Sequence, residues 1–352
     1  MAGERLLLHN AVLVLPDRLV EGGLLVQSGR IASIHTDRRD LTDAARTVDL
    51  RGDYLAPGFI DLHIHGASGV DLMSAGVEDL KRLAAFLLQN GVTRFLPTTV
   101  PSSDAMYVGA VERIAGLLRA QPKEHGRAHA LGIHFEGPFV NPDRSGALNA
   151  GQLRCYRTRS ELELFFPAAI REAGGVVMMT LAPEVEGGLD LVKDLRDSGG
   201  IVAIGHSQAT FEICDAAFER GARHITHFPN ALSPLHHRQP GVLGWGLLHN
   251  GVTVDLIADG MHVERHMIQL VHKNKSPERM GLISDSIAPC GLGDGDYRVW
   301  GEIIRVREGR TSNADGNLAG SVITLHQAVD NLLHWGLPLT SGLRFPLKTV
   351  FS

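Results

Sequence analysis

The segment DLHIHG at residues 61–66 places two histidines one residue apart, at the end of an apolar run and just before a glycine. On a β-strand alternate side chains share a face, so the imidazoles of His63 and His65 would point the same way. Two neutral imidazoles side by side form half of a metal site. The pair alone slightly favours an interpretation in which one histidine packs in the core and the other is solvated. Residues elsewhere in the chain are needed to distinguish this interpretation from a metal site.

Metal-competent side chains recur along the chain at the ends of short apolar segments, and chemistry in barrel enzymes lies at the carboxyl ends of strands. The residues concerned are His63 and His65, Glu136, His206, His227, Asp259 with His262, and Asp285. Packing in the hydrophobic core is a poor explanation for such a set, because charged side chains that are buried need partners. A divalent cation is one such partner.

Eight β-rich segments must position these side chains, and helical periodicity lies between several of them, as at 78–91 and 207–222. The predicted strands are 59–65, 92–98, 129–136, 176–182, 201–206, 223–227, 252–259 and 280–285. This alternation predicts an α/β fold, a TIM-type (β/α)8 barrel. A doubly wound sheet is the alternative, but no predicted strand is followed by a glycine-rich dinucleotide motif.

Residues 1–56 read differently, as short strands bounded by glycine, proline and aspartate, and are expected to form part of a small β domain. The barrel is then expected to span residues 57–352. The sequence thus predicts two domains of unequal size.

The composition of the chain argues against several classes of protein. The chain has 352 residues, a net charge of −5 and 44% apolar residues, enough for a large core, with no basic block that favours nucleic acid. No apolar run approaches membrane-spanning length and no cleavage pattern of a signal peptide is present. Three scattered cysteines form neither a disulfide framework nor a CxxC zinc site. We therefore expect a cytoplasmic protein.

Several other residues could belong to the site, but their positions favour structural roles. His134 shares the face of Glu136 and is expected to be a hydrogen-bonding neighbour, and His224 is expected to be structural. His236 and His237 lie on a predicted loop and are expected to be solvated. Cys290 is expected to be a buried, inert thiol.

Nine motifs, in family order from the start of the chain to about residue 335, resemble the N-acetylglucosamine-6-phosphate deacetylases of the amidohydrolase superfamily. They are PGFIDLHIHG at 57–66, GIHFEGPFVNP at 132–142, LAPE at 181–184, GHS at 205–207, THFPNAL at 226–232, HHRQPG at 236–241, IADGMH at 257–262, ISDSIAP at 283–289 and LAGS at 318–321. The combination of HxEGPF, THxxNA and HHRxPG is specific to this deacetylase, whereas HxH indicates only the superfamily.

The resemblance implies one or two divalent metal ions per chain, zinc as the first choice, with iron, cobalt or manganese as alternatives. Glu136, His206 and His227 match the principal ligands. His63 and His65 match the pair found in members that hold a second ion, with Glu136 as the bridge.

The resemblance also implies a reaction, the hydrolysis of N-acetylglucosamine 6-phosphate to glucosamine 6-phosphate and acetate. Asp285 matches the acid/base that takes a proton from the attacking water and delivers it to the departing amine. The backbone near Asn230 and Ala231, and the guanidinium of Arg238, match the phosphate contacts. The other residues that match substrate-contacting segments are Ala147, Leu148, Asp259, Gly260, Met261, His262, Leu318, Ala319 and Gly320.

The chain departs from the family pattern at several places, among them Ser286, where alanine is commoner, and Pro229, where an aromatic residue is commoner. Two further departures bear on substrate contact and on the small domain. Leu148 stands where many members have a histidine that contacts the substrate, and leucine cannot donate a hydrogen bond. At 339–352 the chain ends without the strands that usually complete the small β domain, so that domain is expected to be incomplete, with exposed sheet edges. Family members are typically homodimers with the pocket near the subunit interface.

Two other functions stay open at this point. One is a different amidohydrolase that acts on another amide or on a cyclic imide, for which Arg238 and the Asn230–Ala231 segment are the discriminating residues. The other is a truncated, inactive barrel with a binding role, suggested by Leu148 and by the chain's end.

Overall fold

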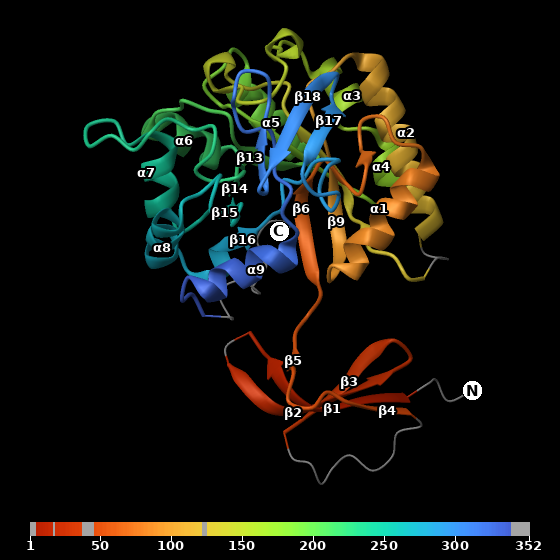
Figure 1. Ribbon diagram of the computed structural model, residues 1–352. Coiled ribbons are helices and arrows are strands. Elements are labelled where there is room, and N and C mark those ends of the chain that lie inside the picture. Colours follow the sequence, from red (N-terminus) through yellow and green to blue (C-terminus); the bar gives the residue numbers. More distant parts are fainter. Residues whose placement is uncertain (1–4, 17, 37–45, 122–124, 339–352) are drawn as a thin grey trace. The chain divides into compact units, whose positions relative to one another are not determined.

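A five-stranded sheet forms the first of the two units into which the chain divides, Met1–Gly58 and Phe59–Ser352. The structure is a computed structural model and describes residues 5–16, 18–36, 46–121 and 125–338 (Figure 1). The strands of the first unit are β1 (Arg5–Val14), β2 (Leu19–Gln27), β3 (Arg30–His35), β4 (Arg46–Asp49) and β5 (Tyr54–Leu55). β1 pairs antiparallel with β2 and parallel with β4 and β5. The segment 339–352, on which the expectation of an incomplete small domain rests, lies outside the described residues.

The second unit is a parallel barrel, which confirms the predicted fold class. Its strands are β6 (Phe59–Ile64), β9 (Val92–Thr99), β10 (His129–Ala130), β11 (Gly132–Glu136), β12 (Val176–Leu181), β13 (Ile201–Ile204), β14 (His224–Ile225), β15 (Thr253–Leu256) and β16 (Met280–Leu282). β6 pairs with β9, and the order then runs through β11 to β16 in chain sequence. A parallel bridge between Ile64 and Ser286 joins the two ends of the sheet.

Two details of the strands differ from the prediction. The segment 129–136 is divided at Leu131, and β10 pairs with β9 alone while β11 pairs with both β9 and β12. Several strands are also shorter than predicted, so that His206, His227 and Asp285 lie beyond β13, β14 and β16. These side chains are therefore carried by the turns that follow the strands.

Helices surround the strands of the barrel (Figure 1). They are α1 (Val77–Gln89), α2 (Asp104–Ala120), α3 (Leu162–Phe165), α4 (Ala168–Glu172), α5 (Gly188–Asp197), α6 (Phe211–Glu219), α7 (Gly241–Leu248), α8 (Arg265–Asn274) and α9 (Leu325–His334). In α1 the buried residues Leu80, Leu83 and Leu87 recur at helical spacing and join the barrel core. Each fully buried leucine contributes about 1.5–3 kcal/mol relative to an exposed one.

A second small sheet follows β16 and was not predicted. It consists of β17 (Gly295–Val299), β18 (Glu302–Arg307) and β19 (Arg310–Ser312) in antiparallel order. A shorter hairpin, β7 (Gly66–Ala67) with β8 (Val70–Asp71), follows β6. The β7–β8 hairpin begins directly after His65, and the three-stranded sheet follows the segment that carries Asp285.

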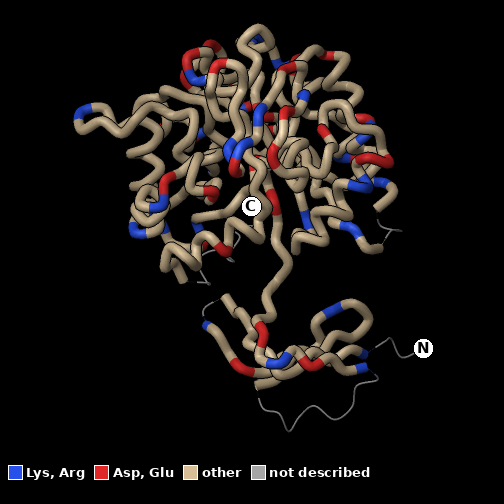
Figure 2. Tube along the Cα trace, in the orientation of Figure 1, with Lys and Arg blue, Asp and Glu red and all other residues tan. Residues whose placement is uncertain are grey.

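Basic and acidic residues are interspersed along the described chain, without a long block of one sign (Figure 2). Within the described ranges, no helix has the length and apolar character needed to cross a bilayer.

Candidate metal centre

Six side chains from five segments meet at the carboxyl end of the barrel. His63 is on β6 and His65 directly follows it, Glu136 is the last residue of β11, and the other three are His206, His227 and Asp285. All six are buried, with exposed fractions of 8% or less. The ligand atoms form two groups, each within 4.8 Å, composed of His63, His65 and Asp285 and of Glu136, His206 and His227.

The second of these groups is a nearly regular triangle. The Nε2 atoms of His206 and His227 lie 2.9 Å and 3.0 Å from Glu136 Oε1, and 3.0 Å from each other. In the first group, His63 Nε2 and His65 Nε2 are 3.0 Å apart and lie 3.4 Å and 3.2 Å from Asp285 Oδ1. Each triangle presents three donor atoms to one point.

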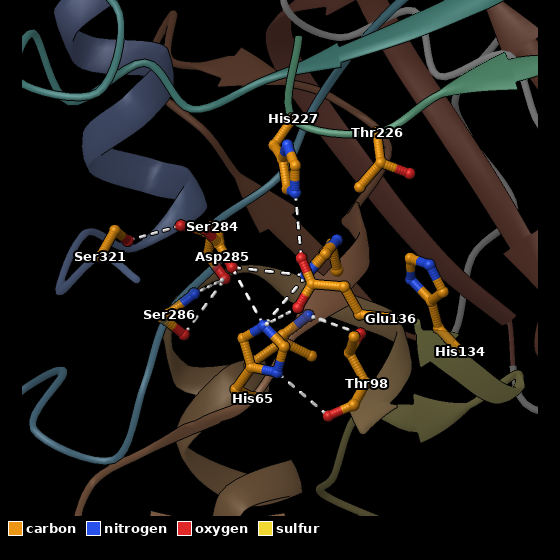
Figure 3. Close-up of polar contacts among 12 residues, drawn as sticks. His65, Thr98, His134, Glu136, Thr226, His227, Ser284, Asp285, Ser286 and Ser321 are labelled. Carbon is orange, nitrogen blue, oxygen red and sulfur yellow. Dashed lines mark hydrogen bonds and ion pairs between the residues drawn. The ribbon is translucent and has the colours of Figure 1, made fainter. Parts of the chain in front are cut away.

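Glu136 connects the two groups. Its Oε1 lies 3.6 Å from His63 Nε2, and its Oε2 lies 3.3 Å from His65 Nε2. Figure 3 shows its carboxylate pointing between His227 and His65. The carboxylate of Glu136 therefore contacts histidines of both groups.

The donor set fits a divalent cation. Ligand atoms 2.0–2.1 Å from a tetrahedral zinc are roughly 3.3 Å apart, and the observed separations scatter around this value. Two imidazole nitrogens that face each other at 3.0 Å share at most one proton, so His206 and His227 are poor partners for each other without a cation between them. Neutral imidazole and carboxylate are also the ligand types that zinc, iron, cobalt and manganese accept.

The electrostatics of the cluster agree with this fit. Burial works against ionisation of Glu136, but the charge of His63 and hydrogen bonds from His206 and His227 hold its pKa well below its usual range. Burial would lower the pKa of His65, but its contacts with Asp285 and Glu136 prevail and raise that pKa to about 10. A cation that binds here takes the place of such protons, so metal binding and proton release are coupled.

The carboxyl group of Asp285 is also ionised, because its surroundings lower its pKa. Burial raises the pKa of its carboxyl, but the hydrogen bond from His65 and the charges of His63 and His65 lower it by more. A buried carboxylate next to the metal ligands can accept a proton from water in the site.

Backbone groups orient the ligands. His65 Nδ1 lies 3.2 Å from the carbonyl oxygen of Thr98, and His206 Nδ1 lies 2.8 Å from that of Arg144. These contacts favour a proton on Nδ1 and leave Nε2 free to bind a cation. The backbone N–H of His227 donates to the carboxylate of Asp255.

Three of the six residues have left-handed backbone. The φ angles are 48° for His206, 34° for His227 and 48° for Asp285. Such positions cost of order 1–3 kcal/mol each in non-glycine residues and persist only where the surroundings enforce them. Here Asp285 N donates to the carbonyl of His63 at 2.9 Å, and Asn141 N donates to that of His206 at 3.0 Å. The backbone of these three residues is thus held in a strained conformation that places their side chains in the ligand groups.

A pocket of about 170 Å³ opens over the cluster. Seven of the twelve residues predicted to contact substrate line it, and these are Ala147, Leu148, Asn230, Ala231, His262, Leu318 and Gly320. His262 Nδ1 lies 2.6 Å from Asp259 Oδ2, so Asp259 supports the ring and leaves Nε2 as the atom that can bond a ligand. Asp259 also accepts hydrogen bonds from the backbone of Met261 and His262.

The other predicted substrate residues lie outside the pocket lining. Ala319 is buried, at 1% exposure, while Gly260 and Met261 belong to the exposed part of their turn. Arg238 is exposed, and its Nη1 lies 2.7 Å from His237 Nε2. Within one chain the structure does not bring Arg238 to the metal cluster.

Two residues that line the pocket were missed by the sequence analysis. Gly146 and Trp300 carry no metal-binding or acid/base group, so nothing in their type suggested a role. Trp300 comes from the unpredicted β17–β18 hairpin, and only recognition of that hairpin could have indicated it.

The residues expected to be structural lie outside the two ligand groups. His134 Nε2 lies 2.7 Å from Thr180 Oγ1, and His224 Nε2 lies 2.7 Å from Asp255 Oδ2. His236 and His237 are exposed. Cys290 is buried, and burial raises the pKa of its thiol to about 12.

Comparison with known proteins places these features in a family context. The amidohydrolase family model matches residues 54–290. The N-acetylglucosamine-6-phosphate deacetylase of Bacillus subtilis (strain 168) is 35% identical over 332 residues, 94% of this chain and 82% of that protein. The N-acetylgalactosamine-6-phosphate deacetylase of Escherichia coli O157:H7 is 34% identical over 318 residues, 88% of this chain and 78% of that protein.

A solved structure also matches this chain. It is a variant of the N-acetyl-D-glucosamine-6-phosphate deacetylase of Mycobacterium smegmatis, with an aspartate replaced by alanine, in complex with N-acetyl-D-glucosamine-6-phosphate. The TM-score is 0.88 at 29% identity, covering 99% of this chain and 91% of that one.

Proposed function

This chain belongs to the amidohydrolase family, and from that premise we propose that it removes the acetyl group of N-acetylglucosamine 6-phosphate in a metal-dependent hydrolysis. The observation that carries the proposal is the convergence of four histidine Nε2 atoms on Glu136 and Asp285 at the barrel mouth. Every residue proposed for the site belongs to Phe59–Ser352, the unit that contains the barrel.

Glu136, His206 and His227 would hold one divalent cation, and His63 and His65 a second, with Glu136 shared between them. A cation bound there supplies Lewis acidity, which lowers the pKa of water and polarises a carbonyl oxygen. Zinc is the first choice for a set of imidazoles and carboxylates, with iron, cobalt and manganese as alternatives.

Asp285 is the proposed acid/base. Its carboxylate is ionised, because the groups around it lower its pKa, and it lies beside His63 and His65. It can therefore take a proton from the attacking water and later give that proton to the amine that leaves. The strained backbone of Asp285 holds the carboxylate at this place before substrate arrives.

The sugar is proposed to contact His262 and the loops that contain Leu148 and Leu318, and the phosphate to lie near Asn230 and Ala231. Asp259 fixes the tautomer of His262, which leaves Nε2 directed to a ligand.

Arg238 needs a further element to reach a phosphate, because it does not line the pocket of its own chain. Figure 1 shows that the loop between α6 and α7 extends away from the barrel. We propose a homodimer in which the exposed loop carrying Arg238 approaches the neighbouring pocket and supplies a guanidinium for the phosphate. We also propose a cytoplasmic location, in keeping with the three free cysteines.

The relative from Escherichia coli gives one specific alternative, the 4-epimeric substrate N-acetylgalactosamine 6-phosphate. A different amide or cyclic imide stays as a further alternative, and the complete ligand set argues against a merely binding role.

The test is acetate release from a panel of N-acetylated amino sugars, with and without the 6-phosphate, after loading of the metal-free protein with defined metals. We expect release from N-acetylglucosamine 6-phosphate, dependence on added metal and a loss of at least 10²-fold in kcat/KM without the phosphate. Better turnover of unphosphorylated amides or of cyclic imides would contradict the proposal. Preference for the galactosamine epimer would revise the sugar and leave the chemistry in place.

A further inference from the structure

Trp300 stands at an unusual place in the chain. Val299 of β17 pairs directly with Glu302 of β18, so Trp300 and Gly301 form a two-residue hairpin turn. Both have positive φ, 51° and 87°. Such turns favour asparagine, aspartate or glycine at the first position, and an aromatic residue there is strained. The strain implies that the indole is held by contacts of its own.

Those contacts are with the metal pocket. The indole meets the imidazole of His65 edge to face, with ring centres 5.2 Å apart and an interplanar angle of 86°. It also packs against the apolar cluster of Met73, Val100, Val140 and Leu148. The hairpin thus brings a large aromatic ring next to one of the candidate metal ligands.

Trp300 and Leu148 contribute apolar surface to the lining of the pocket, whereas Asn230 and His262 contribute polar groups. A phosphorylated amino sugar has hydroxyl groups and charge over most of its surface, and its acyl chain is its apolar end. The acyl carbonyl has to react near His65 and Asp285, so the first carbon of the acyl chain is one bond from that place. Trp300 touches His65 and is therefore within reach of this carbon.

A larger groove is lined by the same two side chains. It has a volume of about 770 Å³ and shares Gly146, Ala147, Leu148 and Trp300 with the metal pocket. Ser102, Ser103, Gln152 and Asn313 are among its other lining residues. The indole of Trp300 is thus part of the partition between a small reaction pocket and a groove with room for several more carbon atoms.

We propose that Trp300 is a specificity-determining residue that closes the acyl end of the metal pocket and restricts the enzyme to short N-acyl groups. This inference rests on the proposed deacetylase function. Removal of the indole joins the pocket to the groove and gives propionyl and butyryl chains a place to lie.

Trp300→Gly is a suitable variant, because glycine relieves the positive φ and the turn should still form. The control is Glu308→Gly, the same kind of change at an exposed residue with φ of 50° in the β18–β19 turn, which lines neither cavity. Trp300→Phe keeps an aromatic ring at the partition. The measured quantity is the ratio of kcat/KM for the N-butyryl sugar phosphate to that for the N-acetyl one.

We expect this ratio to rise by about 10-fold or more in Trp300→Gly, to rise less in Trp300→Phe and to stay unchanged in Glu308→Gly. A second readout needs no turnover: in an Asp285→Asn background, the Kd for the N-butyryl sugar phosphate should fall relative to that for the N-acetyl one when Trp300 is replaced by glycine.

An unchanged ratio in a folded Trp300→Gly variant, or an equal loss for all acyl groups, would overturn the inference while the deacetylase function stands. Failure of the wild-type protein to release acetate from any acetylated amino sugar would instead overturn the proposed function, and this inference with it.

Discussion

Two groups of buried histidines lie in the barrel, one at its mouth and one deeper. The groups differ in the hydrogen-bond partners of their ring nitrogens. At the mouth, His206 Nε2 and His227 Nε2 face each other at 3.0 Å, as do His63 Nε2 and His65 Nε2. His134 lies on β11, two residues before Glu136. Both of its ring nitrogens are within hydrogen-bond distance of protein oxygens, Leu62 O and Thr180 Oγ1. All five of these histidines have exposed fractions of 4% or less, so burial does not separate the two groups.

The deeper group consists of His134 and His224, and both ring nitrogens of each have hydrogen-bond partners within the protein. His224 contacts Thr253 Oγ1 and Asp255 Oδ2, both at 2.7 Å, and Thr180 Oγ1 lies 2.6 Å from Thr226 Oγ1. Burial lowers the pKa of His134 well below its usual value, in keeping with a neutral ring. A structural histidine is thus one whose partners are all present in the chain, and a candidate ligand is one whose partner must come from outside.

The largest expected effect comes from Glu136, because its carboxylate contacts all four histidines of the mouth. Glu136→Gln should lower kcat/KM by about 10³-fold or more, since the Lewis acidity of a bound cation is worth several kcal/mol and the amide holds it poorly. Metal content after dialysis should fall as well. Glu112→Gln, on the exposed face of α2, is the matched control and should change neither value. Retention of metal and full activity in Glu136→Gln would remove the basis for the mouth as a metal centre.

Asp285→Asn separates proton transfer from metal binding. We expect kcat to fall by about 10²–10⁴-fold, because the amide cannot accept a proton. The triangle of Glu136, His206 and His227 is untouched, so the variant should still bind one metal ion. Steady-state kinetics and metal analysis of the same preparation check both points. Wild-type turnover would show that another group is the acid/base.

The contrast between the two histidine groups predicts opposite outcomes for the same substitution. His134→Leu should destabilise the protein by about 2–3 kcal/mol, because Leu62 O and Thr180 Oγ1 lose a buried partner, and it should leave metal content unchanged. His206→Leu should abolish metal binding and change the stability of the metal-free protein by less. Urea unfolding in the presence of a chelator, with metal analysis in its absence, gives both numbers. If His134→Leu lost the metal while His206→Leu kept it, the distinction drawn here would be wrong.

Lys275 is a buried residue outside both histidine groups, and its substitution gives a smaller effect that depends on pH. Its Nζ donates to the carbonyls of His249 and Val252, and burial lowers its pKa from 10.5 to about 8. Between these values the unfolded chain binds the proton and the folded chain does not, so this residue makes stability rise with pH.

From pH 8 to 10.5 the wild type should therefore gain on the order of 1–2 kcal/mol relative to Lys275→Met. The exposed Lys273→Met on α8 serves as the control and should follow the wild type. Parallel stability curves for the wild type and Lys275→Met would contradict the lowered pKa.

The barrel and the convergence of the candidate ligands could be predicted from the sequence for one physical reason. Several strands are apolar runs that end in, or are closely followed by, a polar residue, and the carboxyl ends of parallel strands meet at one mouth. Glu136 and His206 were found in this way. The orienting groups could not be found, because Thr98 and Arg144 act through backbone carbonyls, which every residue carries. Trp300 was missed because its contact with His65 depends on a hairpin fixed by tertiary packing.

Arg238 marks another limit of the sequence. Its motif predicts a phosphate contact, but the motif does not say which chain's pocket the guanidinium serves. Within one chain the side chain is exposed and contacts His237.

The most direct test of the account is anomalous X-ray diffraction from crystals of the zinc-loaded protein, recorded on both sides of the zinc absorption edge. We expect a peak about 2.0–2.2 Å from Glu136 and from the Nε2 atoms of His206 and His227, with any second peak between His63 and His65. Zinc found only at surface histidines such as His236 or His237, with the mouth unchanged and no metal there, would contradict the account.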